Sequence, residues 1–187
     1  MSTLFVNACV RPESRTLRLA KHVLEKLGND YTEVNLEKEN IQPLNLDTLQ
    51  QRDALLEAKG FDAPMLKYAK QFAAADTVVI AAPYWDLSFP AMLKNYIEAV
   101  TVNGITFTYS EEGFPVSLNN IKKVVYVTTA GGPTTHMDFG CEYVTGVCRN
   151  LYRIEDIKCF KAEMLDVIGF DAEEILAKTI EIIDAEM

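Results

Sequence analysis

The sequence predicts an α/β fold in which a doubly wound parallel sheet of five strands, in the order 2-1-3-4-5, has helices on both faces. Two observations predict this class. Short apolar runs rich in β-branched residues alternate along the chain with segments of helical periodicity. The run at residues 77–82 is also almost continuously apolar, which is typical of a strand buried on both faces. The 187 residues, 49% of them hydrophobic, fit one domain with an ample core.

The expected elements follow one another with little chain left over. We expect strands at residues 3–9, 31–36, 77–82, 123–130 and 154–162. The spacing of apolar residues predicts helices at residues 17–27, 46–56, 64–75, 88–100, 136–152 and 171–185. Gly28 ends the first of these helices, and Ser88 is expected to cap the fourth, with Pro90 in its opening turn.

A hairpin is expected between the central helix and the fourth strand. Asn103-Gly104 is a turn signal, and it precedes the alternating run of Ile105, Phe107 and Tyr109. We therefore predict a hairpin insertion near residues 102–118.

The composition limits the classes of binding partner and the cellular compartment that we expect. A formal net charge of −9 argues against nucleic acid or an anionic membrane as a partner. No apolar run reaches the roughly 20 residues that a spanning helix needs. The N-terminus enters a strand without a basic region or a cleavage site, so we expect a cytoplasmic protein.

The cysteines form no recognisable metal or redox motif. There is no C-x-x-C pair, and the two histidines stand alone in the sequence. We expect small buried hydrophobic side chains and no metal site at the four positions Cys9, Cys141, Cys148 and Cys159.

The loop after the first strand, residues 10–16, has the composition of a phosphate site. Ser14 and Thr16 offer hydroxyls, the start of the helix offers free amides, and Arg11 and Arg15 offer charge-assisted hydrogen bonds. The loop has no G-x-G-x-x-G or Walker pattern, which argues against nucleotide sites of those types. A plain N-cap at Ser14 with solvated arginines explains the same residues equally simply.

Two further loops are expected at the same edge of the sheet, because the carboxyl ends of parallel strands meet there. After Pro83 come two aromatic residues, an acid and an aliphatic residue, which is an unusual composition for a connecting loop. After the fourth strand, paired glycines permit a close approach of the backbone, although a simple turn would use the same residues. Together the three loops indicate a mononucleotide with a large flat ring, namely flavin mononucleotide (FMN).

A rival chemistry starts from Cys9. With Arg15 and Thr16 this residue forms the C-x5-R-[ST] signature of cysteine phosphatases, directly after a first strand as in the low-molecular-weight phosphatases. Pro12 has no amide to give to a phosphate, and Glu13 would place a negative charge against it. The chain also lacks an Asp-Pro pair that resembles the general acid of that family.

Several segments resemble one known family. PYWDLSFPAML at residues 83–93 looks like the flavin loop P-M-Y-N-F-S-I-P-x-x-L-K of the FMN-dependent NADH-azoreductases and NAD(P)H:quinone reductases. GITFTYSEEGFPVSL at residues 104–118 is similar to the family's G-x-T-F-x-Y-T-E-x-G-P-x-G-L segment, and TAGG at residues 129–132 to its S-R-G-G loop. Residues 14–16 fall on its S-x-S phosphate loop, and Ala162-Glu163 on the end of its fifth strand.

The resemblance implies a flavodoxin-like FMN-binding domain over residues 1–187. Hydride would pass from NADH or NADPH through FMN to a quinone or azo aromatic acceptor by a ping-pong mechanism, with no side chain acting as acid or base. The family forms homodimers with active sites at the interface, so Phe107 and Tyr109 would reach toward the partner's flavin, and Tyr84 and Tyr109 are candidates for orienting an acceptor. The implied FMN-binding residues are Ser14, Arg15 and Thr16 at the phosphate, Pro83, Tyr84, Trp85, Asp86 and Leu87 beside the ring, largely through backbone amides, and Thr129, Ala130, Gly131 and Gly132 at its polar edge.

The chain departs from the family pattern at three places. Asp86 stands where the family has Asn, Ala130 replaces an Arg, and Phe114 enlarges the turn before Pro115. A carboxylate at position 86 would disfavour an anionic reduced flavin. The alternative function is a flavodoxin-type electron-transfer module without nicotinamide activity. The hairpin predicted near residues 102–118 argues against it, because such a module would not need this additional cover.

Overall fold

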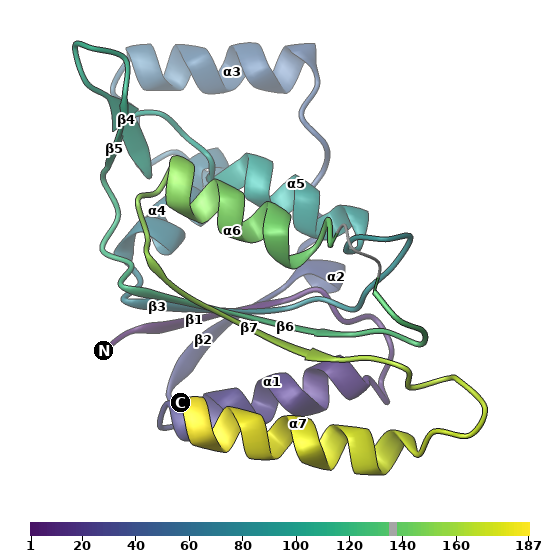
Figure 1. Ribbon diagram of the computed structural model, residues 1–187. Coiled ribbons are helices and arrows are strands. Elements are labelled where there is room, and N and C mark those ends of the chain that lie inside the picture. Colours follow the sequence, from purple (N-terminus) through teal and green to yellow (C-terminus); the bar gives the residue numbers. More distant parts are fainter. Residues whose placement is uncertain (135–137) are drawn as a thin grey trace.

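The computed structural model describes residues 1–134 and 138–187 and confirms the predicted sheet. Five parallel strands lie in the order β2-β1-β3-β6-β7, which is the order 2-1-3-4-5 of the sheet strands. A layer with α1 (Arg15–Lys26) and α7 (Ala172–Glu186) covers one face of the sheet, and a layer with α4 (Lys67–Ala74), α5 (Ala91–Val100) and α6 (Cys141–Asn150) covers the other (Figure 1). The strands are β1 (Thr3–Asn7), β2 (Tyr31–Asn35), β3 (Thr77–Ala81), β6 (Lys123–Thr129) and β7 (Asp156–Ala162).

Helices occupy every region where helical spacing predicted one. In the first layer, Ser14 and Asp171 cap α1 and α7 by accepting hydrogen bonds from amides of the opening turn. The helices are α1 (Arg15–Lys26), α2 (Leu36–Glu39), α3 (Leu46–Glu57), α4 (Lys67–Ala74) with the 3₁₀ turn η1 (Pro64–Leu66) before it, α5 (Ala91–Val100), α6 (Cys141–Asn150) and α7 (Ala172–Glu186).

Two helix starts differ from the prediction. Pro90 rather than Ser88 is the N-cap of α5, because Ser88 closes a turn with Trp85 instead. The helix predicted from residue 136 begins at Cys141, since the Asp138 side chain accepts hydrogen bonds from the amides of Gly140 and Cys141 and holds the preceding residues in a turn. The predicted start at His136 itself lies outside the described residues.

The hairpin exists, but its turn is not at Asn103-Gly104. It pairs β4 (Phe107–Tyr109) with β5 (Pro115–Ser117), and the connection runs through Gly113, whose φ is +84°. The Gly104 amide donates to the Phe107 carbonyl oxygen at 2.8 Å, so the Asn-Gly pair makes a local turn that leads into the hairpin.

Alternate residues of the central strands build two cores, one on each face of the sheet. Val6 and Ile80 belong to the core under α5 and α6, whereas Phe5 and Val79 belong to the core under α1 and α7. Phe107 is only 6% exposed and belongs to the first core. The expectation that Phe107 reaches toward a partner's flavin is therefore wrong, while Tyr109 beside it is 52% exposed.

Half of the prediction for the cysteines is wrong. Cys9 and Cys148 are buried free thiols, as expected. Cys141 and Cys159 are joined by a disulfide between α6 and β7, with their Cα atoms 6.4 Å apart. The partners are 18 positions apart in sequence and join the start of α6 to the edge strand β7. Among the described residues, no helix is long and apolar enough to cross a membrane, and no cluster of metal-ligating side chains occurs.

Candidate functional site

The loops after β1, β3 and β6 meet at one edge of the sheet, and Thr129 joins them. Its hydroxyl lies 2.6 Å from that of Thr16, and its carbonyl oxygen accepts a hydrogen bond of 3.0 Å from the Tyr84 amide. A cavity of about 250 Å³ lies where the loops meet. Eight of the twelve predicted FMN-binding residues line it: Ser14, Arg15, Thr16, Pro83, Tyr84, Trp85, Thr129 and Gly131.

The other four predicted residues lie beside the cavity rather than in its wall. Asp86 and Leu87 are exposed at the tip of a turn, and Ala130 is buried directly after the end of β6. Gly132 follows the lining residue Gly131, and its carbonyl oxygen accepts a hydrogen bond from the Met164 amide at 3.2 Å.

The first loop presents the start of α1 to the cavity. Ser14 Oγ accepts a hydrogen bond from the Leu17 amide at 3.1 Å, which leaves the amides of Arg15 and Thr16 without partners inside the helix. The Thr16 side chain is 1% exposed and its hydroxyl is bonded to Thr129, so Thr16 can offer an anion only its amide. The helix dipole adds a partial positive charge at this position.

Arg15 is shared between the cavity and the loop after β7. Its guanidinium donates to the Leu165 carbonyl oxygen at 3.0 Å and to Asp166 Oδ1 at 2.9 Å. Asp166 also explains why residue 131 is glycine, because a Cβ at position 131 would collide with the Asp166 carboxylate. The amide of Asp166 donates to the Gly131 carbonyl oxygen at 2.8 Å, so the third loop fits against this carboxylate.

The second loop is a tight two-residue turn. The amides of Trp85 and Ser88 donate to each other's carbonyl oxygens at 3.0 and 2.8 Å, and the two central residues, Asp86 and Leu87, have φ values of +51° and +68°. Positive φ at both central positions is the type I′ geometry, in which Asn and Asp are tolerated at low cost. Asp86 therefore suits this turn as well as the Asn of the resembling family would.

Fewer backbone amides of the second and third loops are free to bind FMN than we expected from the sequence. The amides of Tyr84 and Trp85 are used inside the protein. In the second loop those of Asp86 and Leu87 make no hydrogen bond with any described residue. The Ala130 amide likewise donates to the Ala162 carbonyl oxygen at 2.9 Å, whereas Gly131 lines the cavity with its amide available.

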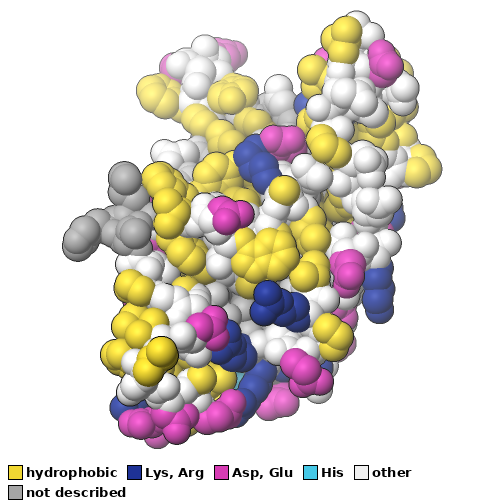
Figure 2. Space-filling model, turned by 90° about the vertical axis from the view of Figure 1, so that its right-hand side faces the viewer, with side chains coloured by type: hydrophobic (Ala, Val, Ile, Leu, Met, Phe, Trp, Pro, Cys, Tyr) yellow, Lys and Arg dark blue, Asp and Glu magenta, His cyan; other side chains and the backbone are white. Residues whose placement is uncertain are grey.

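Exposed apolar side chains lie beside the cavity, whose own wall is mostly polar. Figure 2 shows this edge of the molecule, where hydrophobic side chains gather with Lys and Arg side chains beside them. Trp85, Leu87 and Phe139 are 38%, 49% and 47% exposed. The Tyr84 hydroxyl, by contrast, is buried and has no hydrogen-bond partner among the described residues. A flat ligand with polar edges suits this combination of apolar surface and unused donors.

Comparison with known proteins decides the family. A family model described as flavodoxin-like fold matches residues 1–187. The chain belongs to this flavodoxin-like family. The FMN-dependent NADH:quinone oxidoreductase 2 of Clostridium acetobutylicum is 40% identical over 190 residues, which cover 95% of this chain and 94% of the relative. The FMN-dependent NADH:quinone oxidoreductase of Coprothermobacter proteolyticus is 38% identical over 174 residues, which cover 87% and 85%.

A solved structure supports the same assignment. The azoreductase from Bacillus anthracis superposes on this flavodoxin-like protein with a TM-score of 0.83 and 28% sequence identity, over 98% of this chain and 97% of that one. The resemblance to FMN-dependent azoreductases and quinone reductases is therefore confirmed.

The geometry of this flavodoxin-like protein argues against the rival phosphatase chemistry. Cys9 is 6% exposed, and burial raises the pKa of its thiol to about 11, with only partial compensation from a hydrogen bond with Ser14. A thiol with that pKa is protonated at neutral pH and is a poor nucleophile. Cys9 is a core residue whose Sγ lies 3.8 Å from the Ala81 carbonyl oxygen.

Two groups that shape the site were not predicted from any sequence pattern. Asp166 lines the cavity and pairs with Arg15 from 151 positions away. Lys161 binds Thr134 and Asp138 in the segment that follows the third loop. The motif Ala162-Glu163 was the sole hint that the end of β7 belongs to the site, because tertiary pairs of this kind leave no local pattern.

Proposed function

We propose that this flavodoxin-like protein is an FMN-dependent oxidoreductase that passes hydride from NADH or NADPH through bound FMN to a quinone or azo aromatic acceptor in a ping-pong reaction. The observation that carries the proposal is that the loops after β1, β3 and β6 meet at Thr129. The start of α1 and the turn that contains Trp85 therefore lie at the same cavity. Relatives named FMN-dependent NADH:quinone oxidoreductases and azoreductases support it.

The residues of the cavity fit FMN. The amides of Arg15 and Thr16 and the dipole of α1 suit the phosphate, while the Tyr84 hydroxyl and the Gly131 amide suit polar atoms of the flavin. Two carboxylates also line the cavity. Glu13 carries a negative charge that opposes a phosphate, whereas the charge of Asp166 is paired with Arg15. We propose that the eight predicted residues that line the cavity contact FMN, with Thr16 acting through its amide, and that Asp86, Leu87, Ala130 and Gly132 border the FMN site beside them.

The chain's own residues bind, orient and shield, and the bound flavin supplies the two-electron chemistry. The start of α1 holds the phosphate end, and the hydrogen bonds at Thr129 keep the first and second loops in fixed relation to it. Trp85 and Leu87 offer apolar surface on which a nicotinamide ring or a flat acceptor can lie. Such a site lowers the barrier chiefly by orientation and by exclusion of water.

One anaerobic experiment tests the function. The protein is soaked in excess FMN, dialysed, and titrated with NADH without oxygen, after which a quinone is added. We expect the yellow colour to persist through dialysis, to bleach with NADH and to return with the quinone. Loss of all flavin on dialysis would overturn the proposal. Retention of colour without bleaching by NADH or NADPH would favour the flavodoxin-type electron-transfer module instead.

The ping-pong order has its own readout. Initial rates measured at several fixed quinone concentrations should give parallel lines in double-reciprocal plots against NADH. Intersecting lines would mean that donor and acceptor bind together, which contradicts a shared surface.

We also propose that the protein works as a homodimer in the cytoplasm. The cavity is formed by loops at the rim of the molecule, beside the exposed side chains of Trp85 and Leu87, and a second copy that covers this rim would complete its wall. Tyr109 and Phe114 on the hairpin are 52% and 69% exposed and supply apolar surface for that copy. Light scattering after size-exclusion chromatography should give twice the chain mass, and a monomer mass would contradict the dimer.

A further inference from the structure

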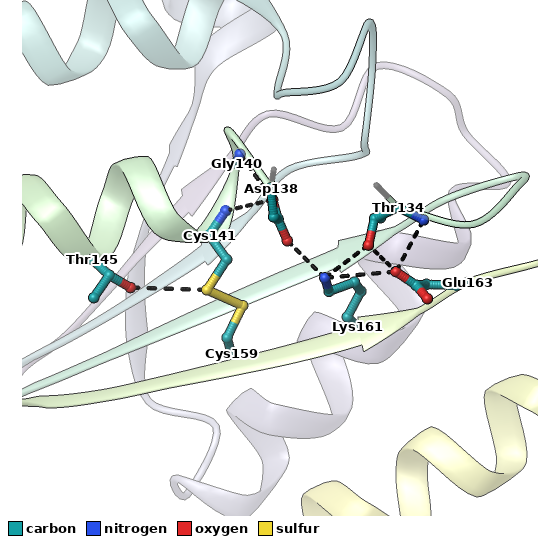
Figure 3. Close-up of polar contacts among 8 residues, drawn as sticks. All are labelled: Thr134, Asp138, Gly140, Cys141, Thr145, Cys159, Lys161 and Glu163. Atoms are coloured by element: carbon teal, nitrogen blue, oxygen red, sulfur yellow. Dashed lines mark hydrogen bonds and ion pairs between the residues drawn. A yellow bond between two sulfur atoms is a disulfide. The ribbon is translucent and has the colours of Figure 1, made fainter. Parts of the chain in front are cut away.

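Alternate residues at the end of β7 reach one short segment beside the third loop. Cys159, Lys161 and Glu163 lie at every second position and so point to the same side. Figure 3 shows all three turned toward Thr134 and the residues from Asp138 to Cys141, which we call the rim segment. Cys159 is bonded to Cys141, and Glu163 Oε1 accepts a hydrogen bond from the Thr134 amide at 3.1 Å.

Lys161 is the centre of these contacts. Its Nζ lies 2.9 Å from Thr134 Oγ1, 2.7 Å from Asp138 Oδ2 and 3.6 Å from Glu163 Oε1. The Asp138 side chain is only 10% exposed, and that of Lys161 is 28% exposed. Removal of the ammonium group would leave a buried carboxylate without its ion partner, which is strongly unfavourable.

Asp138 links Lys161 to the start of α6. Its Oδ1 accepts hydrogen bonds from the amides of Gly140 at 2.9 Å and Cys141 at 3.0 Å, while Oδ2 binds Lys161. One carboxylate therefore holds the opening turn of α6 and is itself held by β7. Phe139 lies between these bonded residues, so its backbone position follows from that of Asp138.

Phe139 connects the rim segment with the aromatic turn of the second loop. Ser88 Oγ donates to the Phe139 carbonyl oxygen at 3.1 Å, and Ser88 closes the turn that carries Trp85 and Leu87. The exposed side chains of Phe139, Trp85 and Leu87 thus sit on two segments joined by a hydrogen bond. These are the apolar side chains on which a flat substrate would lie.

We propose that Lys161 is a positioning residue: by holding Thr134 and Asp138 it fixes Phe139 against the aromatic turn and so forms one wall of the acceptor site. The proposal rests on the oxidoreductase function proposed above. Lys161 acts through Asp138 and has no part in hydride transfer. The phosphate end of the cavity, at the start of α1, does not depend on it.

The proposal predicts an effect on acceptor binding with little effect on turnover. In Lys161→Met, which keeps a chain of similar length without the charge, we expect the KM for a quinone to rise about tenfold, which corresponds to about 1.4 kcal/mol. We expect kcat and the Kd for FMN to change less than about twofold, because neither depends on the rim segment. Lys161→Arg, which retains a cation, should restore most of the acceptor affinity.

Two further variants separate positioning from general stability. Lys158→Met removes a lysine from the same strand, but its Nζ binds the Glu186 carbonyl oxygen near the end of α7, so its KM should equal that of the wild type. Phe139→Ala removes the exposed side chain itself and should raise the quinone KM as Lys161→Met does. The double variant of Lys161 and Phe139 should show no additional rise, because both changes remove one wall.

The following outcomes would overturn the proposal for Lys161. A wild-type KM in Lys161→Met that retains its flavin would show that the rim segment is held without Lys161. Loss of FMN from Lys161→Met, or an equal rise of KM in Lys158→Met, would mean that the lysine supports the fold. If Lys161→Met fails to fold, Phe139→Ala provides the test. A wild-type quinone KM in that variant would contradict the proposal that Phe139 forms a wall of the acceptor site. If the wild-type protein does not bleach with NADH or NADPH, the failure belongs to the proposed function instead.

Discussion

Thr129 is the residue on which the convergence of the loops depends. Its hydroxyl and that of Thr16 satisfy each other in a buried position. Thr129→Val removes one partner and leaves the other hydroxyl buried and unsatisfied, which costs about 1–3 kcal/mol of the free energy of unfolding. Urea denaturation measures this loss. The double change Thr16→Val with Thr129→Val removes both polar groups and should recover most of it, and an additive loss in the double variant would contradict a direct pair.

Gly131 and Gly132 provide a matched pair of substitutions. A Cβ at position 131 would collide with the Asp166 carboxylate, whereas a Cβ at position 132 has no heavy atom of the described residues within 4 Å. We expect Gly131→Ala to lose about 1–3 kcal/mol of stability through overpacking and to weaken FMN binding. Gly132→Ala should leave the stability near that of the wild type. Equal losses of stability from the two changes in thermal unfolding would refute the close approach of Asp166.

At the scale of elements, the join between β7 and α6 makes stability depend on pH. Burial disfavours the charged form of Asp138, but hydrogen bonds from Lys161 and from the amides of Cys141 and Gly140 outweigh it and lower the pKa of this carboxyl. A carboxyl whose pKa is lower in the folded state than in the unfolded state contributes stability above its unfolded pKa of about 3.9 and loses it as pH falls through the folded value.

Asp138→Asn isolates this contribution. The difference in free energy of unfolding between the wild type and the variant should be largest near neutral pH and should shrink as pH falls below about 4. Urea titrations at several pH values measure it. A difference that stays constant down to the acid range would assign the effect of the substitution to packing rather than to the charge of Asp138.

The elements also show where sequence reasoning works and where it fails. The strand at residues 77–82 was predictable because both of its faces are buried, so all its residues after Thr77 are apolar. The start of α6 was misplaced because its opening turn is held by Asp138 rather than by a residue in the usual cap position. The hairpin turn was misplaced because the stronger local signal, Asn103-Gly104, serves a different turn.

At the scale of the whole molecule, the site was predictable as a set of loops but not as a set of contacts. Parallel strands bring their following loops to one edge whatever the details, so eight of twelve residues line the cavity as expected. The bonds of Arg15 with Asp166 and of Lys161 with Asp138 join segments far apart in sequence. Such pairs depend on how loops pack, and no local periodicity reports them.

The charge of the whole molecule bears on the choice of electron donor. The net charge is −9, and three cations near the rim are paired with acids: Arg15 with Asp166, Arg18 with Glu173 and Lys161 with Asp138. Arg11 in the cavity wall makes no ion pair with a described residue, so it is the cation that could oppose this trend. NADPH has one phosphate group more than NADH and should therefore be repelled more strongly at low ionic strength.

This repulsion predicts a salt-dependent preference between the two donors. We expect kcat/KM to favour NADH at low salt, and the ratio for NADPH over NADH to rise roughly twofold as the ionic strength approaches 0.15 M, where the screening length falls to about 8 Å. Stopped-flow measurement of flavin reduction by each donor tests the ratio directly. A preference for NADPH at low salt would mean that a cation at the rim binds its additional phosphate, and a ratio independent of salt would show that contacts rather than net charge select the donor.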